Sequence, residues 1–324
     1  MGAGSAALLT RTRRPKAYVT AHHVADKYAP EIRRAIQRGL AMARARLRHR
    51  DLVLQVQSLD VVSRIPWEIV EADLFASLFA ALTDTHKASA KAHLDAITGI
   101  RKAPRQFGNP EIFPSRSVFF QPRQFGSPEG VYDLIFDATN PEATSWARRR
   151  SAELVTQVTG ESKLAVRQVV TRMFQDGVTP QQAARQLRGI IGLTERDALA
   201  VDNLRRSMTA AGRSRTQIER AVERASAKYI RRRAETIART ESMRASNKGQ
   251  QALWRQAQAN GLLGSDPRQK WIVTPDELLC PICSELGDLE PIALGQSFFS
   301  SAGIFDAPPA HPSCRCALAL TDSA

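Results

Sequence analysis

The sequence predicts a mainly α-helical protein that ends in a small α+β module clipped by a metal ion. Aromatic residues make up only 6% of the 324 residues, whereas the helix-favouring residues Ala, Arg, Gln and Leu are abundant. All four cysteines lie within the last forty-five residues, which predicts a separate module there. The length and the hydrophobic content of 43% suit a chain of two or more units.

The composition changes along the chain and predicts four regions. We expect a basic N-terminal helical region over residues 1–96, an irregular arm rich in Pro, Gly and Phe over 97–141, a helical core over 142–262 and a Cys/His module over 263–324. No apolar run reaches the length of a membrane span, and Arg11 interrupts the opening apolar residues too early for a signal peptide. We therefore expect the protein in a cytosol.

The N-terminal region carries apolar residues at helical spacing, which predict helices over 28–50 and 67–82. The second is strongly amphipathic and has acidic residues on its polar face. We therefore expect it to pack on a core or a partner rather than on a membrane. His86 and His93 lie in a polar stretch with two lysines, and we expect both histidines at the surface.

An eight-residue phrase occurs twice in the arm, over 104–111 and 122–129, and the copies differ only at Asn109 and Ser127. Each copy combines proline, phenylalanine and glycine, which favours an extended arm or stacked turns. Two interpretations remain open. One is a loop with a local duplication, and the other is an arm that docks on another subunit through its phenylalanines, Phe107, Phe113, Phe119, Phe120 and Phe125.

The helical core should be a bundle with short connections. The apolar periodicity predicts helices that begin near residues 141, 161, 180 and 195, followed by a long basic helix over 216–260. Thr194 is placed to cap the fourth of these helices, and Gly261 to end the long one.

The positive charge gathers in two blocks. Residues 1–50 hold twelve Lys or Arg residues against Asp26 and Glu31, and residues 205–244 hold twelve against four acids. Such blocks favour contact with a polyanion such as double-stranded DNA, although a solvated helix face explains them as well. We find no helix-turn-helix signature or stacking platform, so any DNA contact should be non-specific and made through phosphates.

The Cys/His module has the spacing of a structural zinc site. Cys280 and Cys283 form one pair of ligands, and His311, Cys314 and Cys316 compete for the two remaining places of a tetrahedron. A structural zinc ion would stabilise a module that is too small to bury a large core and whose aromatic cluster is limited to Trp271, Phe298, Phe299 and Phe305. Disulfides and unrelated free thiols are the competing interpretations. A catalytic zinc is disfavoured because no H-x-E signature precedes the first pair.

The join between the long helix and the module carries further motifs. The chain reads Ala238-Arg239-Thr240-Glu241, then Asn247 and Trp254, and ends in Pro308-Pro309-x-His311-Pro312-x-Cys314-Arg315-Cys316. This succession resembles the phage minor head protein family, also called the Mu F-like head morphogenesis family of tailed bacteriophages. The resemblance covers about residues 142–320.

The resemblance implies a structural role in the virion, with the host cytoplasm as the place of assembly. Proteins of this kind associate with the portal protein at the portal vertex, and they act in procapsid assembly or in the packaging and ejection of DNA. Scaffold or major capsid protein are further implied partners. The family defines no catalytic centre, and the sequence contains no P-loop, G-x-S-x-G or H-E-x-x-H motif.

The motif of Arg239, Thr240 and Glu241 is best interpreted as three polar helix residues, with Arg239 and Glu241 pairing with neighbouring turns. A second interpretation, between this one and a catalytic role, is that they hold the long helix against the module. An enzyme that acts on nucleic acid, or a toxin-like effector that carries a minor head domain, is the alternative. The first 140 residues hold no acidic or histidine cluster suited to it. A zinc-finger regulator is disfavoured because the module is acidic and would repel phosphates.

Overall fold

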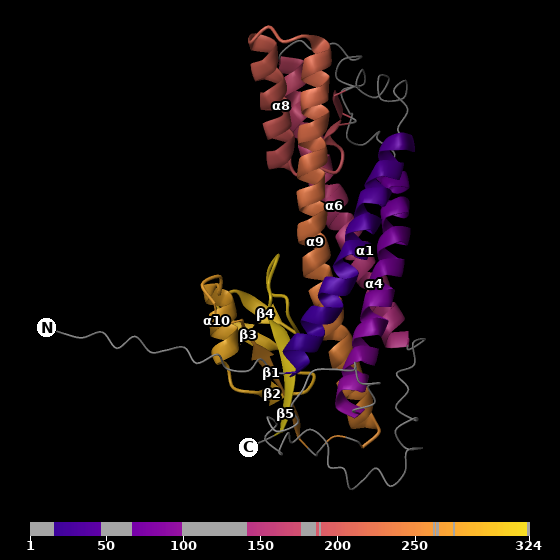
Figure 1. Ribbon diagram of the computed structural model, residues 1–324, viewed down its shortest axis with the longest axis vertical. Coiled ribbons are helices and arrows are strands. Elements are labelled where there is room, and N and C mark those ends of the chain that lie inside the picture. The colour runs from indigo at the N-terminus through magenta and orange to yellow at the C-terminus, as the bar shows by residue number, and fades with distance from the viewer. Residues whose placement is uncertain are drawn as a thin grey trace, which may run out of the picture. The chain divides into compact units, whose positions relative to one another are not determined.

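A computed structural model describes residues 16–46, 67–98, 141–175, 186–187, 189–261, 263, 266–274 and 276–322. The described chain is mainly helical, as predicted, with strands only near the C-terminal end (Figure 1). The helices are α1 (Lys16–Arg46), α4 (Trp67–Thr98), α6 (Pro141–Gln175), α8 (Glu195–Ala210), α9 (Arg215–Ala259) and α10 (Pro281–Asp288). The duplicated phrase and its phenylalanines lie outside the described residues.

The helix ends show which sequence signals decided the local structure. Thr194 caps α8 as predicted, because its side chain accepts a hydrogen bond from the Asp197 backbone at 3.2 Å. The long helix α9 spans Arg215–Ala259, one residue away from the predicted bounds at each end. Gly261 follows it with a φ of 68°, a conformation that favours glycine and ends the helix.

Residues 141–175 form one helix instead of the two that were predicted to meet near Glu161. Gly160 lies inside α6, but a glycine costs a helix only about 1 kcal/mol relative to alanine. The buried stripe of Leu154, Val158, Ala165 and Val169 continues in phase across it. The packing therefore outweighs the local weakness.

The prediction that His86 and His93 lie at the surface is wrong. His86 is 2% exposed, and its ring packs at a tilt against Trp146 of α6, with 5.1 Å between the ring centroids. His93 is 3% exposed, and its Nδ1 lies 2.9 Å from the Ser89 carbonyl. The helix α4 runs on to Thr98 instead of ending at Leu82, because these polar residues belong to its buried face.

The chain divides into two compact units, and the divisions fall inside α1, α4 and α9. The helical unit comprises residues 25–87 and 137–245. Its core is a single apolar cluster to which α1, α4, α6, α8 and α9 all contribute, including Ile36, Leu74, Val166, Ile191 and Val201. No described helix is long and apolar enough to cross a membrane.

The C-terminal unit comprises residues 1–24, 88–136 and 246–324. Its strands are β1 (Pro267–Ile272), β2 (Ile292–Ala293), β3 (Phe298–Ser300), β4 (Gly303–Phe305) and β5 (Ala317–Asp322). An antiparallel sheet has the order β2-β1-β5, and β3 and β4 form a separate antiparallel hairpin. Strands and α10 enclose the Cys/His residues, and we call residues 266–322 the C-terminal module.

Candidate metal centre

The first pair of cysteines lies at the start of α10. Cys280 is the N-cap residue, and its sulfur accepts a hydrogen bond from the Cys283 backbone N–H at 3.3 Å. Pro281 occupies the first turn, where its missing N–H costs nothing. The cap geometry turns both thiols toward one point from a single short helix.

The second pair lies in a turn that precedes β5. The Cys314 N–H donates to the His311 carbonyl at 3.2 Å, which closes a turn over His311–Cys314. The Pro312 carbonyl lies 2.9 Å from His311 Nδ1 and can only accept, so Nδ1 carries the proton. The lone pair of Nε2 is then left for the thiols or for a metal ion.

The two turns bring the thiols and the imidazole together. His311 Nε2 lies 3.1 Å from Cys280 Sγ and 3.2 Å from Cys283 Sγ. Cys283 Sγ lies 3.6 Å from Cys314 Sγ. Cys280, Cys283 and His311 form one group that could hold a metal ion, and Cys283, Cys314 and Cys316 form a second group that shares Cys283.

These separations fit the edges of a tetrahedral zinc site. With zinc-to-ligand distances of about 2.3 Å for sulfur and about 2.0 Å for nitrogen, neighbouring ligand atoms lie roughly 3.5–3.8 Å apart. The thiol and imidazole atoms are already within a few tenths of an ångström of that spacing. All four cysteines are free thiols in the structure, and three of them are buried.

The electrostatics of the cluster favours a cation. A hydrogen bond from Cys316 lowers the pKa of the Cys314 thiol to about 5, against the opposing effect of burial. Burial, with the charge on Cys314, raises the pKa of Cys283 to about 12. Interactions with Cys283 and His311 also lower the pKa of Cys280, so burial opposes ionisation most strongly at Cys283, where a divalent cation would favour the thiolate.

Cys316 has a different environment from the other candidate ligands. It is 2% exposed, and its thiol donates to the Cys314 thiolate. Donating that hydrogen bond, together with burial, raises the pKa of Cys316. Cys316 therefore either orients Cys314 through this hydrogen bond or, once a cation lets it ionise, takes the fourth ligand place itself.

The aromatic residues of the module close one side of the cluster. Trp271 of β1 packs edge-on against Phe298 and Phe305, at ring centroid distances of 5.3 and 6.3 Å. Phe299 does not join them, contrary to the predicted cluster, and is 66% exposed. Alternate residues of a strand point to opposite faces, so the chain cannot bury Phe298 and Phe299 on the same side.

The C-terminal part of α9 is joined to the module by buried amide side chains. Asn247 accepts from the Leu318 N–H at 3.0 Å, which ties α9 to β5. Gln251 donates to Gln269 Oε1 at 2.9 Å and to the Asp306 carbonyl at 2.8 Å, and Gln269 donates to the Gln296 carbonyl at 2.7 Å. Asn247, one of the residues on which the family resemblance rests, thus serves to pack α9 against β5. Nothing in the sequence around Gln251 and Gln269 predicted that these two polar side chains would be buried and hydrogen-bonded to each other.

Glu241 of the Ala-Arg-Thr-Glu motif lies in the helical unit. Its carboxylate accepts two hydrogen bonds from Arg150 of α6, at 2.6 and 2.7 Å, and pairs with Arg244 one turn along α9 at 3.4 Å. Glu241 is 2% exposed, so this is a buried ion pair between two helices. The sequence predicted pairing within one helix and did not point to Arg150, because a single charge 91 positions away leaves no periodic signal.

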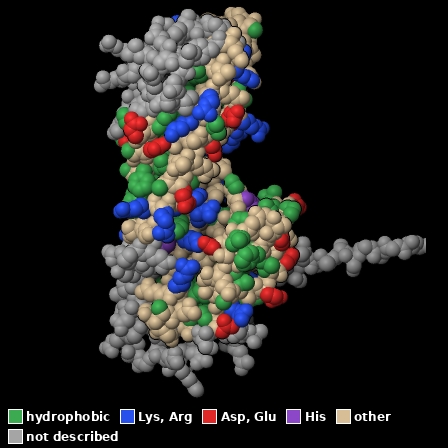
Figure 2. All heavy atoms as spheres, turned by 180° about the vertical axis from the view of Figure 1, so that it is seen from behind, with side chains coloured by type: hydrophobic (Ala, Val, Ile, Leu, Met, Phe, Trp, Pro, Cys, Tyr) green, Lys and Arg blue, Asp and Glu red, His purple; other side chains and the backbone are tan. Residues whose placement is uncertain are grey.

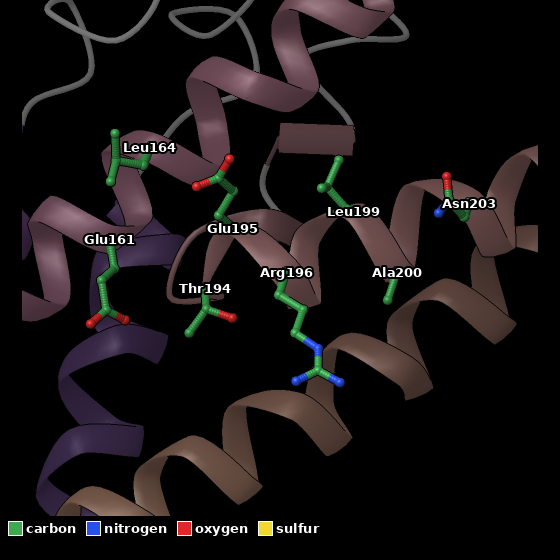
Figure 3. Close-up of a pocket in the computed structure, with 8 residues that line it drawn as sticks. All are labelled: Glu161, Leu164, Thr194, Glu195, Arg196, Leu199, Ala200 and Asn203. Carbon is green, nitrogen blue, oxygen red and sulfur yellow. The ribbon is translucent and has the colours of Figure 1, made fainter. Parts of the chain in front are cut away.

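A pocket lies between α6 and α8 in the helical unit (Figure 3). Its lining holds the carboxylates of Glu161 and Glu195 and the guanidinium of Arg196, with Leu164 and Leu199 among its apolar residues. Glu161 is already paired with Arg233 at 2.7 Å. No nucleophile with an adjacent base lines this pocket, so its lining does not resemble an active site.

A comparison with protein families gives a match in the C-terminal part of the chain. Residues 200–319 match the model of the family described as "Phage Mu protein F like protein". The match spans most of α8, all of α9 and the module up to β5, and it includes the Ala-Arg-Thr-Glu stretch and all five candidate ligands. The predicted resemblance is confirmed for this segment. No curated protein and no solved structure matches the chain.

Proposed function

We propose that this chain, a Mu F-like phage head morphogenesis protein whose residues 200–319 belong to the Phage Mu protein F like family, acts at the portal vertex of a tailed phage. As a phage head protein it is a component of the virion. Its role there is structural, in procapsid assembly and in the packaging or ejection of DNA, and assembly takes place in the host cytoplasm. The family match is the observation that carries this proposal.

The metal centre serves this role as a structural zinc site. Cys280, Cys283 and His311 bind the ion together with Cys314, and the Cys316 thiol holds Cys314 in place. A zinc ion held by these residues would cross-link the start of α10 to the turn before β5. Five candidate ligands are present for the four places of a tetrahedron, which supports a closed structural site over a catalytic one with an open place.

A non-enzymatic role is supported by what the motif residues do. Glu241 is used in an ion pair between α6 and α9, and Asn247 is used in packing α9 on β5. Residues that bear charge or amide groups in the matched segment thus have structural partners instead of facing a substrate pocket. This distribution is typical of a binding or assembly protein.

The portal contact is tested by co-purification with the portal protein encoded in the same genome. The untagged full chain should co-purify with tagged portal protein, and the complex should survive gel filtration. A scaffold protein and the major capsid protein from the same genome serve as parallel baits. Retention by the capsid or scaffold protein with none by the portal would contradict the portal assignment.

Duplex DNA is the second proposed partner, and α9 offers the surface. Arg220, Arg224, Lys228 and Arg231 are all exposed and follow one face of the helix at spacings of three and four residues. None of them forms an ion pair with another described residue, whereas Arg205, Arg206, Arg232 and Arg233 do. A row of uncompensated cations fits a phosphate backbone.

Filter binding of an arbitrary duplex over a series of salt concentrations tests this surface. Replacing Arg220, Arg224 and Lys228 by Gln should weaken binding and reduce the magnitude of the salt slope by about three. The matched control replaces three exposed arginines of α6, Arg148, Arg149 and Arg167, by Gln. Equal loss in both triple variants would show that net charge alone is responsible, and would contradict a surface on α9.

A further inference from the structure

The β3–β4 hairpin of the module has one buried and one exposed face. Phe298 and Phe305 are register partners that face Trp271. Phe299 and Ile304 are the next register partners, and they are 66% and 65% exposed. Register partners of an antiparallel pair have Cβ atoms roughly 5 Å apart, so these two side chains form one continuous apolar patch. Solitary exposed apolar residues are ordinary, but a paired Phe and Ile on a structured hairpin are not.

Hydrogen bonds at both ends hold this hairpin in shape. At its tip, Glu285 of α10 accepts from the Ser301 N–H at 2.7 Å and from the Ser301 hydroxyl at 2.6 Å. At its base, the Ser297 hydroxyl donates to Asp306 at 2.7 Å. The exposed pair therefore lies on an ordered hairpin, so less conformational entropy is lost when a partner binds it.

The module that carries the patch has more acidic than basic side chains. Hydrophobic and acidic side chains gather on the surface of the module (Figure 2). Glu277, Glu285, Asp288 and Glu290 form no ion pair with a described residue. Of the three module cations, Arg268, Lys270 and Arg315, the two arginines pair with Asp266 and Asp276. The hydrogen bonds from Ser301 lower the pKa of Glu285, which keeps this carboxylate ionised beside the hairpin tip.

We propose that Phe299 and Ile304 form a docking surface for a partner protein segment in which an apolar side chain is flanked by Lys or Arg residues. The apolar pair supplies the anchor, and Glu285 at the hairpin tip, with the excess of acidic residues in the module, supplies attraction and selects for a basic partner. The inference deepens the portal contact proposed above and rests on it, since it assigns the side of the chain that makes the contact.

The test measures binding of the purified full chain to the portal protein of the same genome by biolayer interferometry. Replacing Phe299 and Ile304 together by Ser should weaken binding by at least about tenfold, as truncation of central anchors does. Leu278→Ser is the matched control, because Leu278 is 78% exposed in the same module but outside the hairpin, and its binding should stay unchanged. Zinc content and circular dichroism check that each variant is folded.

Two single variants test the charge of the partner. Ile304→Arg and Ile304→Glu place opposite charges at the centre of the patch, and against a basic partner the Arg variant should bind several-fold more weakly than the Glu variant. Equal weakening by both would overturn the basic partner. Wild-type affinity in the Phe299→Ser, Ile304→Ser double variant would overturn the hairpin and leave the portal contact standing.

Two further outcomes separate the remaining cases. Failure of the wild-type chain to bind the portal protein would remove the proposed portal contact and this surface with it. Sedimentation velocity of the chain alone should give the same species for the wild type and the double variant. A wild-type dimer that the double variant lacks would identify a second copy as the occupant and overturn the proposed partner.

Discussion

The helical unit and the C-terminal module reach a stable structure by different means. Among the described residues, the helical unit buries 31 apolar side chains in one cluster, whereas the module cluster has ten, three of which are cysteines. A small core leaves little free energy to offset the entropy of ordering the chain. The comparison indicates that the large core needs no cross-link, while the small one depends on its Cys/His cluster.

Removal of a metal ligand should have the largest effect and should separate the two regions. We expect Cys283→Ser to abolish zinc binding and unfold the module, because structural zinc contributes an apparent 10–16 kcal/mol, roughly, to the folding of small domains. Elemental analysis should give zinc near zero instead of about one per chain. Hydrogen exchange should show lost protection in β1, β3 and β5 but not in α6. Retained protection in the metal-free module would contradict the conclusion that the module depends on its Cys/His cluster for stability.

Cys316→Ser is the matched control for that experiment. Cys316 is as buried as Cys314, and in the proposed ligand set it hydrogen-bonds Cys314 instead of binding the ion, so Cys316→Ser should keep zinc near one per chain while Cys314→Ser should not. The opposite result would exchange the roles of Cys314 and Cys316 in the proposed ligand set.

The buried ion pair of the helical unit should give the next largest effect. Glu241→Ala leaves Arg150 without its main partner in a largely buried site, which costs about 3 kcal/mol of unfolding free energy. Replacing both residues by apolar ones, as Arg150→Met with Glu241→Leu, should restore much of this loss. Denaturant unfolding measures both. A double variant as unstable as the single one would show that Glu241 matters through other contacts.

The sequence predicted those parts of the fold that leave a local or periodic signal. The apolar stripes, the Thr194 cap and the stop at Gly261 placed α8 and α9 to within a residue or two. The cysteine spacing located the candidate site, because ligand pairs in turns must lie close in sequence. Spacing alone did not decide which two of His311, Cys314 and Cys316 complete the site, and this choice stays a prediction.

Features that depend on contacts between distant segments were not predicted. The burial of His86 requires Trp146, and the burial of Glu241 requires Arg150, each from a separate helix. The exposure of Phe299 depends on the register of a hairpin of which each strand has three residues, too short to show a period in the sequence. Tertiary packing set these environments.

Gly287→Ala should destabilise the module by about 1–2 kcal/mol. An added Cβ would lie 2.6 Å from Val273 Cγ1, and the branched valine side chain has little freedom to move away. The gain in helix propensity within α10 offsets only part of the strain. Zinc affinity, measured by competition with a chelator, should fall with stability if the small core and the metal site depend on each other.

Gly160→Ala in the helical unit should have the smallest effect, and of the opposite sign. A Cβ at this position of α6 meets no atom within 4 Å, so alanine adds helix propensity without strain and should stabilise the unit by about 0.5–1 kcal/mol. Gly212→Ala is the control: its Cβ would also lie in open space, but its φ of 65° disfavours alanine, and that variant should be less stable. Denaturant midpoints of the two variants should move in opposite directions. Equal shifts would mean that the backbone conformation does not determine the effect of these two substitutions on stability. The helical unit would then tolerate local strain that the module is expected not to tolerate.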